Sequence, residues 1–277
     1  MINYNEDLDY LQPIQIADGI YWIGFYDDNA GLHCNPYLIV EGDEAVIIDG
    51  GSRDHFSTVM LKILRLGVKP KNINRLIYSH FDPDLCGNLP HLEALIDSPE
   101  LRIISHKENN TFLNYYSSVT PKLCIEDLGF EHTFKTGRKL KFYLTPYAHA
   151  PGNFITYDCK TGTLFTSDIF GSYDETWNLY GSLNEECHSC NPEKSCPTYK
   201  TSCPIYGIIE FHRKSMNSAS SLRYALEIIE EIDPILVAPQ HGSLIASKKD
   251  LQTIIRILKE EEYIGFDYFL QEKRNGS

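Results

Sequence analysis

The stretch RLIYSHFDPD, residues 75–84, joins a predicted β-strand to a short run of residues that can bind metal. The apolar part of RLIYSH is typical of a strand that ends at His80. Asp82 and Asp84 follow at alternate positions, and alternate side chains of an extended segment point the same way. We therefore expect one imidazole and two carboxylates to converge on metal. The alternative is that both aspartates are turn residues around Pro83.

Strand and helix patterns alternate on both sides of this stretch. Short apolar runs separated by turn residues predict strands at 20–25, 36–42, 44–51, 141–147, 154–159, 163–170 and 235–240. Apolar residues with helical spacing predict helices at 56–64, 89–96, 107–117, 222–232 and 251–258. This order predicts two half-domains of similar construction. Two sheets packed together and flanked by helices would account for it. We expect one domain over residues 1–277, with a Cys-rich insertion at about 181–204.

Further candidate ligands stand at the ends of later predicted strands. His149 follows KFYLTPY, Asp168 lies in TLFTSDIF, and His241 follows ILVAPQ. Loops beyond strand ends are where α/β folds place their sites. Each histidine taken alone is better explained as an ordinary surface or core residue, but three in equivalent positions with carboxylates indicate a metal site. Three histidines and three aspartates suffice for two metals if one carboxylate bridges.

These motifs resemble the metallo-β-lactamase superfamily. SHFDPDLCGNLP is similar to its His-x-[His/Glu/Asp]-x-Asp-His segment, and TPYAHAPGN, LFTSDIFG and APQHG are similar to its later ligand motifs. EAVIIDGG, which contains Asp49, resembles its early strand. The subgroup that the chain resembles most is the diiron domain of flavodiiron proteins, together with stand-alone oxygen-binding diiron proteins. The resemblance implies an α/β (α+β) fold, a four-layer αββα sandwich.

The resemblance also implies a ligand set, residue by residue. The first ion, metal one, would be held by His80, Asp82 and His149. The second ion, metal two, would be held by Asp84 and His241, with Asp168 as the bridge. A carboxylate at position 82, where hydrolytic zinc members usually have histidine, favours two iron ions over zinc. Leu85 stands where the family motif has its final histidine, so metal two lacks one ligand. The alternatives are that water completes this ion, that it binds more weakly or is more open to a small molecule, or that it is absent and the site is mononuclear.

Eight cysteines add a second candidate site. Cys187, Cys190, Cys196 and Cys203 offer four thiols that could bind zinc or an iron–sulfur centre; redox-active or plain thiols are the alternatives. His188 could substitute for one of them. Cys34, Cys86, Cys124 and Cys159 are scattered, and we expect them in the core.

Composition limits the function. A net charge of −13 disfavours nucleic acid, no apolar run is long enough for a membrane span, and the acidic start is not a secretory signal, so we expect a cytoplasmic protein.

The resemblance implies a protein that senses or reduces dioxygen or nitric oxide. A separate redox protein would supply electrons, because we expect no flavodoxin domain. A signalling partner and a homodimer are further expectations. The alternative is a zinc-dependent dinuclear hydrolase.

Overall fold

The first half of the chain forms a seven-stranded sheet in the part that the structure describes. That structure, a computed structural model, describes residues 8–25, 32–116, 119–173, 177–190, 203 and 205–275. The strands of the first sheet lie in chain order: β1 Ile14–Ala17, β2 Ile20–Trp22, β3 Tyr37–Glu41, β4 Glu44–Ile48, β5 Ile73–Ile77, β6 Arg102–Ser105 and β7 Lys122–Cys124. Neighbours are antiparallel from β1 to β4 and parallel from β4 to β7.

The second half of the described chain also forms a seven-stranded sheet, although its strands do not lie in chain order. Its sheet has the order β12-β14-β13-β11-β10-β9-β8. The strands are β8 Glu131–Thr133, β9 Lys139–Leu144, β10 Phe154–Asp158, β11 Thr163–Phe165, β12 Tyr180–Gly181, β13 Leu236–Ala238 and β14 Leu244–Ile245. The pairs β11·β13 and β12·β14 are parallel, and the rest are antiparallel. The two halves predicted from the sequence are therefore two sheets.

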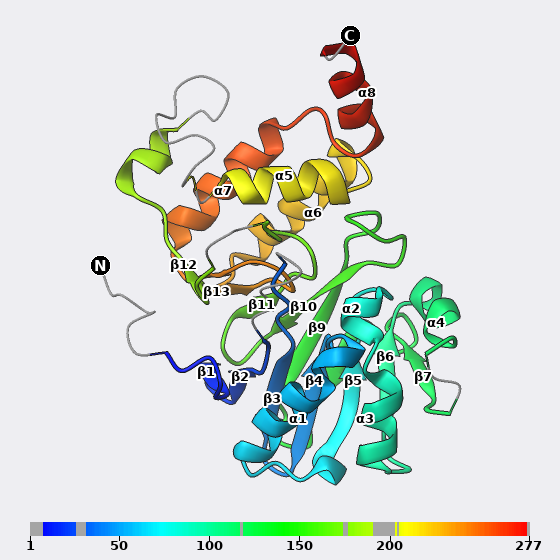
Figure 1. The fold of residues 1–277 in the computed structure, drawn as a ribbon. Helices are drawn as coiled ribbons and strands as arrows, with labels where there is room; N and C mark the ends of the chain where they lie inside the picture. Colours follow the sequence, from blue (N-terminus) through cyan, green and yellow to red (C-terminus); the bar gives the residue numbers. More distant parts are fainter. Residues whose placement is uncertain are drawn as a thin grey trace.

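Helices cover the outer face of each sheet (Figure 1). The first sheet carries α1 Phe56–Arg65, α2 Pro83–Cys86, α3 Leu89–Ile96 and α4 Lys107–Leu113. The second carries α5 Tyr206–Ser215, α6 Ala219–Ile232 and α7 Lys248–Glu260, and α8 Phe266–Asn275 follows at the end of the described chain. Short 3-10 turns lie at Arg53–His55, Pro70–Asn72 and Glu185–Ser189.

Three apolar layers separate these four layers of secondary structure. Neighbouring residues of one strand point to opposite faces, so Ile47 packs toward the helices of its own sheet while Val46 packs between the sheets. In the second sheet Phe165 packs between the sheets and Leu164 packs toward α5, α6 and α7. Burial of apolar surface in three layers is what holds two sheets and their helices together. The predicted four-layer αββα sandwich is confirmed.

A buried ion pair also links the two sheets. The guanidinium of Arg138, just before β9, donates to both carboxylate oxygens of Asp158 in β10, at 2.8 and 2.9 Å. Its remaining nitrogen donates to Glu41, at the end of β3, at 3.0 Å. The Arg138 and Asp158 side chains are almost wholly buried. The charges are thus paired where solvent does not reach them.

The structure adds helices that the sequence patterns did not indicate: α5 and α8, and the short α2. Residues 206–215 form α5, whose His212 accepts a hydrogen bond from the backbone N–H of Phe170 at 3.1 Å. The predicted helix at 89–96 is confirmed as α3. The Ser247 side chain caps α7 by accepting from the backbone N–H of Asp250. A single domain over 1–277 with an insertion at 181–204 stays a prediction, because residues 191–202 and 204 lie outside the described residues.

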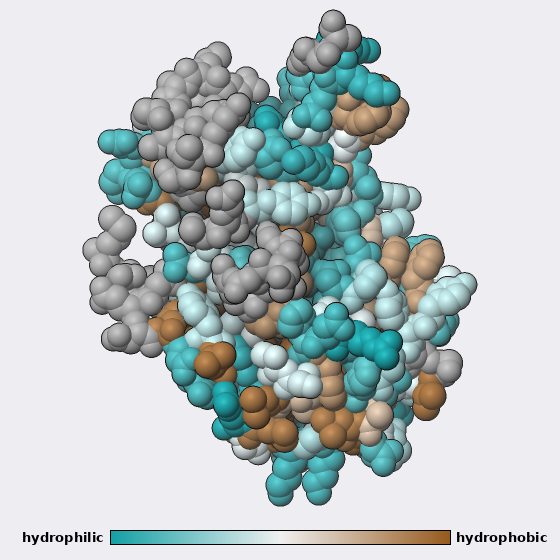
Figure 2. Space-filling view, viewed as in Figure 1, coloured by the Kyte–Doolittle hydropathy of each residue, from teal (hydrophilic) through white to brown (hydrophobic). Residues whose placement is uncertain are grey.

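The surface is mostly polar, with scattered apolar side chains (Figure 2). An apolar patch lies beside α8, where Phe266 and Phe269 are exposed and their rings stack. None of the described helices has the length and apolarity needed to cross a membrane.

Candidate metal centre

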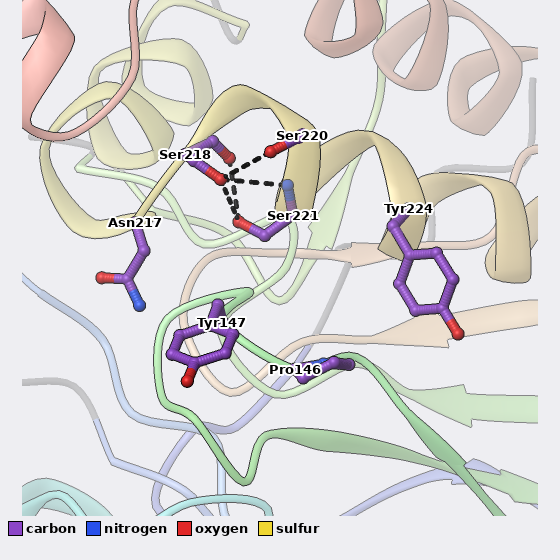
Figure 3. A pocket seen from close by; sticks show the side chains of 7 residues that line it. All are labelled: Pro146, Tyr147, Asn217, Ser218, Ser220, Ser221 and Tyr224. Atoms are coloured by element: carbon purple, nitrogen blue, oxygen red, sulfur yellow. Dashed lines mark hydrogen bonds between the residues drawn. The ribbon is translucent and has the colours of Figure 1, made fainter.

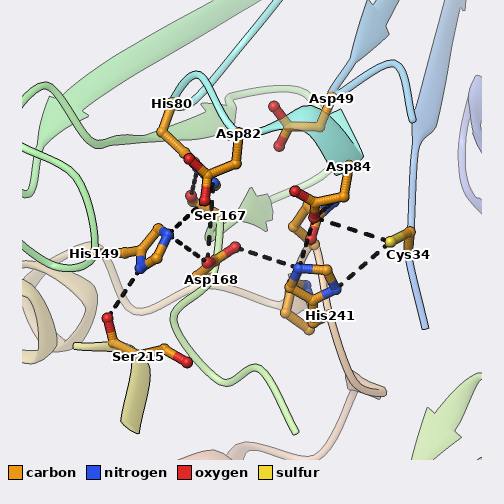
Figure 4. A network of polar contacts seen from close by, with 12 residues as sticks. Cys34, Asp49, His80, Asp82, Asp84, His149, Ser167, Asp168, Ser215 and His241 are labelled. Carbon is orange, nitrogen blue, oxygen red and sulfur yellow. Dashed lines mark hydrogen bonds and ion pairs between the residues drawn. The ribbon is translucent and has the colours of Figure 1, made fainter. Parts of the chain in front are cut away.

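Three predicted ligands occupy equivalent places in the fold. His80, Asp168 and His241 each stand three residues beyond the last residue of β5, β11 and β13. These strands have parallel neighbours, and ligand sites of α/β sheets lie outside the carboxyl ends of such strands. His149, which the sequence placed in an equivalent position, instead stands five residues beyond β9, a strand with antiparallel neighbours. Figure 4 shows the side chains converging from these loops on one centre.

The predicted ligands of metal one lie together. Nε2 of His149 lies 2.8 Å from Oδ2 of Asp82, and Nε2 of His80 lies 3.8 Å from the same oxygen. His80 is buried, whereas Asp82 and His149 are partly exposed. This half of the centre is therefore open to solvent on the side of Asp82 and His149.

The predicted ligands of metal two lie together as well. Nε2 of His241 lies 3.0 Å from Oδ2 of Asp84, which also accepts a hydrogen bond from the Gln240 side chain at 3.3 Å. The His241 side chain is buried, and Asp84 is about one-third exposed.

Asp168 lies between the two halves. Its Oδ2 is 3.9 Å from Nε2 of His80 and 3.7 Å from Nε2 of His149. Its Oδ1 is 3.9 Å from Nε2 of His241, is buried, and has no hydrogen-bond partner. A buried carboxylate oxygen without a partner is costly. One oxygen toward each half is the arrangement that a bridging carboxylate needs.

All three imidazoles present the same nitrogen to the centre, because Nδ1 of each has an acceptor elsewhere. Nδ1 of His149 lies 2.9 Å from the carbonyl oxygen of Ser215, and Nδ1 of His241 lies 2.9 Å from that of His33. Nδ1 of His80 lies 3.0 Å from the hydroxyl of Ser167. Partners of this kind orient the ring and select the tautomer of a metal-ligating histidine.

The charges of the centre also suit cations. Burial lowers the pKa of His149, but the hydrogen bond to Asp82 and the charge of Asp168 outweigh it and raise that pKa to about 9. Burial raises the pKa of Asp84, but the hydrogen bond from His241 outweighs it and lowers that pKa to about 2. Burial also lowers the pKa of His241, but contacts with Asp84 and the charge of Asp168 outweigh it and raise that pKa, so neighbouring carboxylates hold protons on His149 and His241. Metal ions would supply the positive charge in place of these protons.

Backbone strain is concentrated in the same loops. Five non-glycine residues near the centre have positive φ: Asp49, Tyr147, His149, Ser167 and Phe170. A left-handed backbone is costly for such residues and persists where surrounding contacts impose it. The Asp49 carboxylate, for example, accepts from the backbone N–H and hydroxyl of Ser79 at 3.0–3.1 Å.

The reason given for Asp84 from the sequence was wrong, although its place at the centre was right. Residues 83–86 form the short helix α2 rather than an extended segment, with Pro83 in its first turn, where proline is favoured. Asp82 precedes the helix with extended φ and ψ, and Asp84 lies within it. The helical turn directs Asp84 to His241, away from Asp82 and His149.

Cys34 is a residue near the centre that the sequence analysis assigned only to the core. Its Sγ lies 4.0 Å from Oδ2 of Asp84 and 3.8 Å from Nδ1 of His241. Candidate ligand atoms form two groups among the described residues: Cys34, Asp84 and His241, and His80, His149 and Asp168. In the sequence, only the position of Cys34 next to His33 and ahead of a strand pointed to a place near the centre. Cys86 is buried, and its Sγ lies 3.6 Å from the carbonyl oxygen of His80. The expectation of a core position was wrong for Cys159, which is exposed, and Cys124 is only partly buried.

The Cys-rich segment gives no second group among the described residues. Cys187 and Cys203 are partly buried against the core of the second half, and Cys190 follows the 3-10 turn at Glu185–Ser189. Cys196 lies outside the described residues. Zinc or iron–sulfur binding there stays a prediction.

A hollow of about 490 Å³ adjoins the loop that carries His149 (Figure 3). Tyr147 lines it, together with Tyr224 and the residues that begin α6. Asn217, also in its wall, donates from its side chain to the carbonyl oxygen of His149 at 2.7 Å. The hollow therefore borders the backbone of the loop rather than the ligand atoms.

Fold and geometry define the class: an αββα protein of the metallo-β-lactamase type, with a candidate dinuclear centre at the strand ends. A family model described as "ODP family beta lactamase" matches residues 32–242, and the chain belongs to that family.

Solved structures agree with this fold. The structure described as "Peroxy diiron species of chemotaxis sensor ODP" is 21% identical with a TM-score of 0.71, and the match covers 91% of this chain and 94% of that one. A variant flavo di-iron protein from Thermotoga maritima is 22% identical with a TM-score of 0.74, covering 89% of this chain and 60% of that one.

Among relatives in sequence, the type A flavoprotein fprA of Rhodobacter capsulatus is 24% identical over 247 residues, 85% of this chain and 53% of the relative. The chain thus spans about half the length of that relative.

Proposed function

We propose that this protein is a non-haem diiron protein that binds dioxygen or nitric oxide. The observation that carries the proposal is the position of Asp168, one of whose oxygens faces His80 and His149 while the other faces His241. This is how one carboxylate would join two ions. Family membership and the diiron proteins among the structural neighbours support the same assignment.

The ligand assignment follows the two halves of the centre. Metal one would be held by His80, Asp82 and His149, and metal two by Asp84 and His241, with Asp168 between them. A ligand set that combines hard carboxylate oxygens with imidazoles suits iron. A set made of imidazoles alone suits zinc. Two reduced iron ions would supply electrons and open coordination positions for a diatomic ligand.

The protein itself would orient the ligands and limit access. The Nδ1 partners of the three histidines hold each ring with Nε2 inward. Asp82 and His149 form the partly exposed side, by which a small molecule would enter. Leu85 is fully buried in the apolar layer next to α1 and α3, so position 85 adds no polar group to the centre.

The test is anaerobic reconstitution with Fe(II), followed by metal analysis and by optical spectra before and after addition of dioxygen or nitric oxide. We expect two iron ions per chain and a spectral change with either gas. His80→Ala and His149→Ala should lose metal one and the response to dioxygen while staying folded. His91→Gln, in α3 and outside the centre, is the matched control. Stoichiometric zinc with ester hydrolysis and no response to either gas would instead support the hydrolase.

Gas consumption by the same iron-loaded protein distinguishes a sensor from a reductase. With an added chemical reductant, a reductase consumes many equivalents of gas per centre, whereas a sensor binds about one. A redox or signalling protein as partner is part of the proposal, and the ratio of gas consumed to centres decides which kind to seek.

A further inference from the structure

The second half of the centre lacks a donor if only the predicted ligands are counted. Asp84 and His241, with one oxygen of Asp168, give metal two three protein donors. Leu85 adds none, because its side chain is fully buried in an apolar layer. A further protein donor would have to come from another part of the chain.

The backbone places Cys34 at this half. Residue 34 forms an isolated antiparallel bridge with His241, and the N–H of Asn35 donates to the carbonyl oxygen of Gln240 at 2.8 Å. The buried side chain of Asn35 donates to the carbonyl oxygens of Pro239 and Gly242, at 3.1 and 2.8 Å. Four contacts thus fix the segment around Cys34 against the loop that carries His241.

The distances fit coordination of one ion. Sγ of Cys34, an oxygen of Asp84 and a ring nitrogen of His241 all lie within 4.8 Å of one another. The contact of Sγ with His241 is to Nδ1, at 3.8 Å, so an ion on Nε2 would meet Sγ across the edge of the ring. Metal–sulfur and metal–oxygen bonds of about 2.3 and 2.1 Å allow a sulfur and an oxygen on one ion to lie up to about 4.4 Å apart. The observed separation between Cys34 Sγ and Asp84 Oδ2 is 4.0 Å.

Asp168 marks the position of the ion in this half of the centre. Its Oδ1, buried and without a hydrogen-bond partner, faces His241 rather than the other half. A polar atom in that state calls for a ligand at this position. Figure 4 shows Cys34 and Asp168 on different sides of His241 and Asp84.

We propose that Cys34 is a thiolate ligand of metal two and takes the place of the donor that Leu85 does not provide. This inference rests on the diiron centre proposed above. On binding, the S–H bond breaks, the proton goes to solvent, and a sulfur–metal bond forms without a change of oxidation state. A thiolate gives metal two a softer and more negative donor set than metal one. The two ions are therefore chemically unequal.

The test is titration with Co(II), whose bond to a thiolate gives a charge-transfer band in the near ultraviolet. It is done in a background in which Cys187, Cys190, Cys196 and Cys203 are all replaced by serine, so that the Cys-rich segment does not supply the sulfur. We expect two bound ions and a band that Cys34→Ser and Cys34→Ala abolish. These variants should also weaken the second binding step by about 10-fold or more.

The controls are Cys86→Ser, which removes a buried thiol at the end of α2, and Cys159→Ser, which removes an exposed one; both should keep the band. Circular dichroism establishes that each variant is folded. Two bound ions without a sulfur band, or a band that survives in folded Cys34→Ser, would overturn the role of Cys34 and leave the diiron proposal standing. Failure to bind two ions at all would overturn both.

Discussion

Nδ1 of His241 lies 2.9 Å from the carbonyl oxygen of His33, although the two residues are 208 positions apart in the chain. The contact joins the segment ahead of β3 to the loop after β13. It leaves Nε2 of His241 to face Asp84 and Asp168. The same division between an outer Nδ1 and an inner Nε2 holds for His80 and His149, and it is the basis of the first prediction.

Ser167→Ala should weaken metal one without unfolding the protein. The Ser167 hydroxyl donates to the side-chain oxygen of Asn153 at 2.8 Å, so it accepts from Nδ1–H of His80. Loss of such an outer contact costs about 10-fold in metal affinity. Metal titration with a competing chelator measures the change. Ser172→Ala is the control, since this buried hydroxyl bonds to none of the ligands; equal affinity in wild type and Ser167→Ala would refute the orienting role.

Leu85→His should strengthen metal two, and most clearly in Cys34→Ala. The substitution returns the nitrogen donor that the family motif has at this position. We expect Cys34→Ala to bind the second ion more weakly and Cys34→Ala/Leu85→His to recover affinity in the same titration. Leu85→Met, which keeps the apolar volume, should not recover it. Recovery in the Met variant would show that packing rather than coordination is responsible.

Acid should destabilise the metal-free protein through His212. This residue is fully buried in α5, and burial lowers its pKa to about 4, from an ordinary value of 6.5. Because the folded state has the lower pKa, the stability is present above pH 6.5 and is lost as the pH falls toward 4. The loss amounts to about 3 kcal/mol across that window.

Urea unfolding at a series of pH values measures this effect. His212→Gln removes the titrating group, so its free energy of unfolding should fall less steeply over the same window. Identical slopes for wild type and His212→Gln would contradict the assignment. His132, whose pKa burial also lowers to about 4, should leave a residual slope in the variant.

Arg138→Ala should destabilise the fold by about 3–5 kcal/mol, because it leaves a buried carboxylate without its partner. Asp158 has no solvent exposure, and two of its hydrogen bonds come from Arg138. Urea unfolding of both single variants and the double variant gives the coupling energy. Asp158→Ala in the Arg138→Ala background should recover part of the loss. If the free-energy changes of the two single variants add up to that of the double variant, the ion pair contributes no coupling energy.

Local patterns in the sequence determined much of the architecture. Apolar alternation and helical spacing are properties of neighbouring residues, so the central strands of both sheets and α3 followed from short windows, whereas the short strands β1, β7, β12 and β14 did not. His80, Asp168 and His241 were found for the same reason, since each follows a recognisable strand at a fixed interval.

Only the tertiary structure decided how the two halves of the centre are built. Cys34 meets Asp84 and His241 because the two sheets pack face to face, and the sequence around Cys34 offers no sign of that contact beyond its place next to His33 and ahead of a strand. The direction of Asp84 depends on the turn of α2, which a view of the segment as extended missed. Neighbouring residues set the elements, but contacts between distant residues form only when the sheets pack, so the partners of each ligand had to be seen in three dimensions.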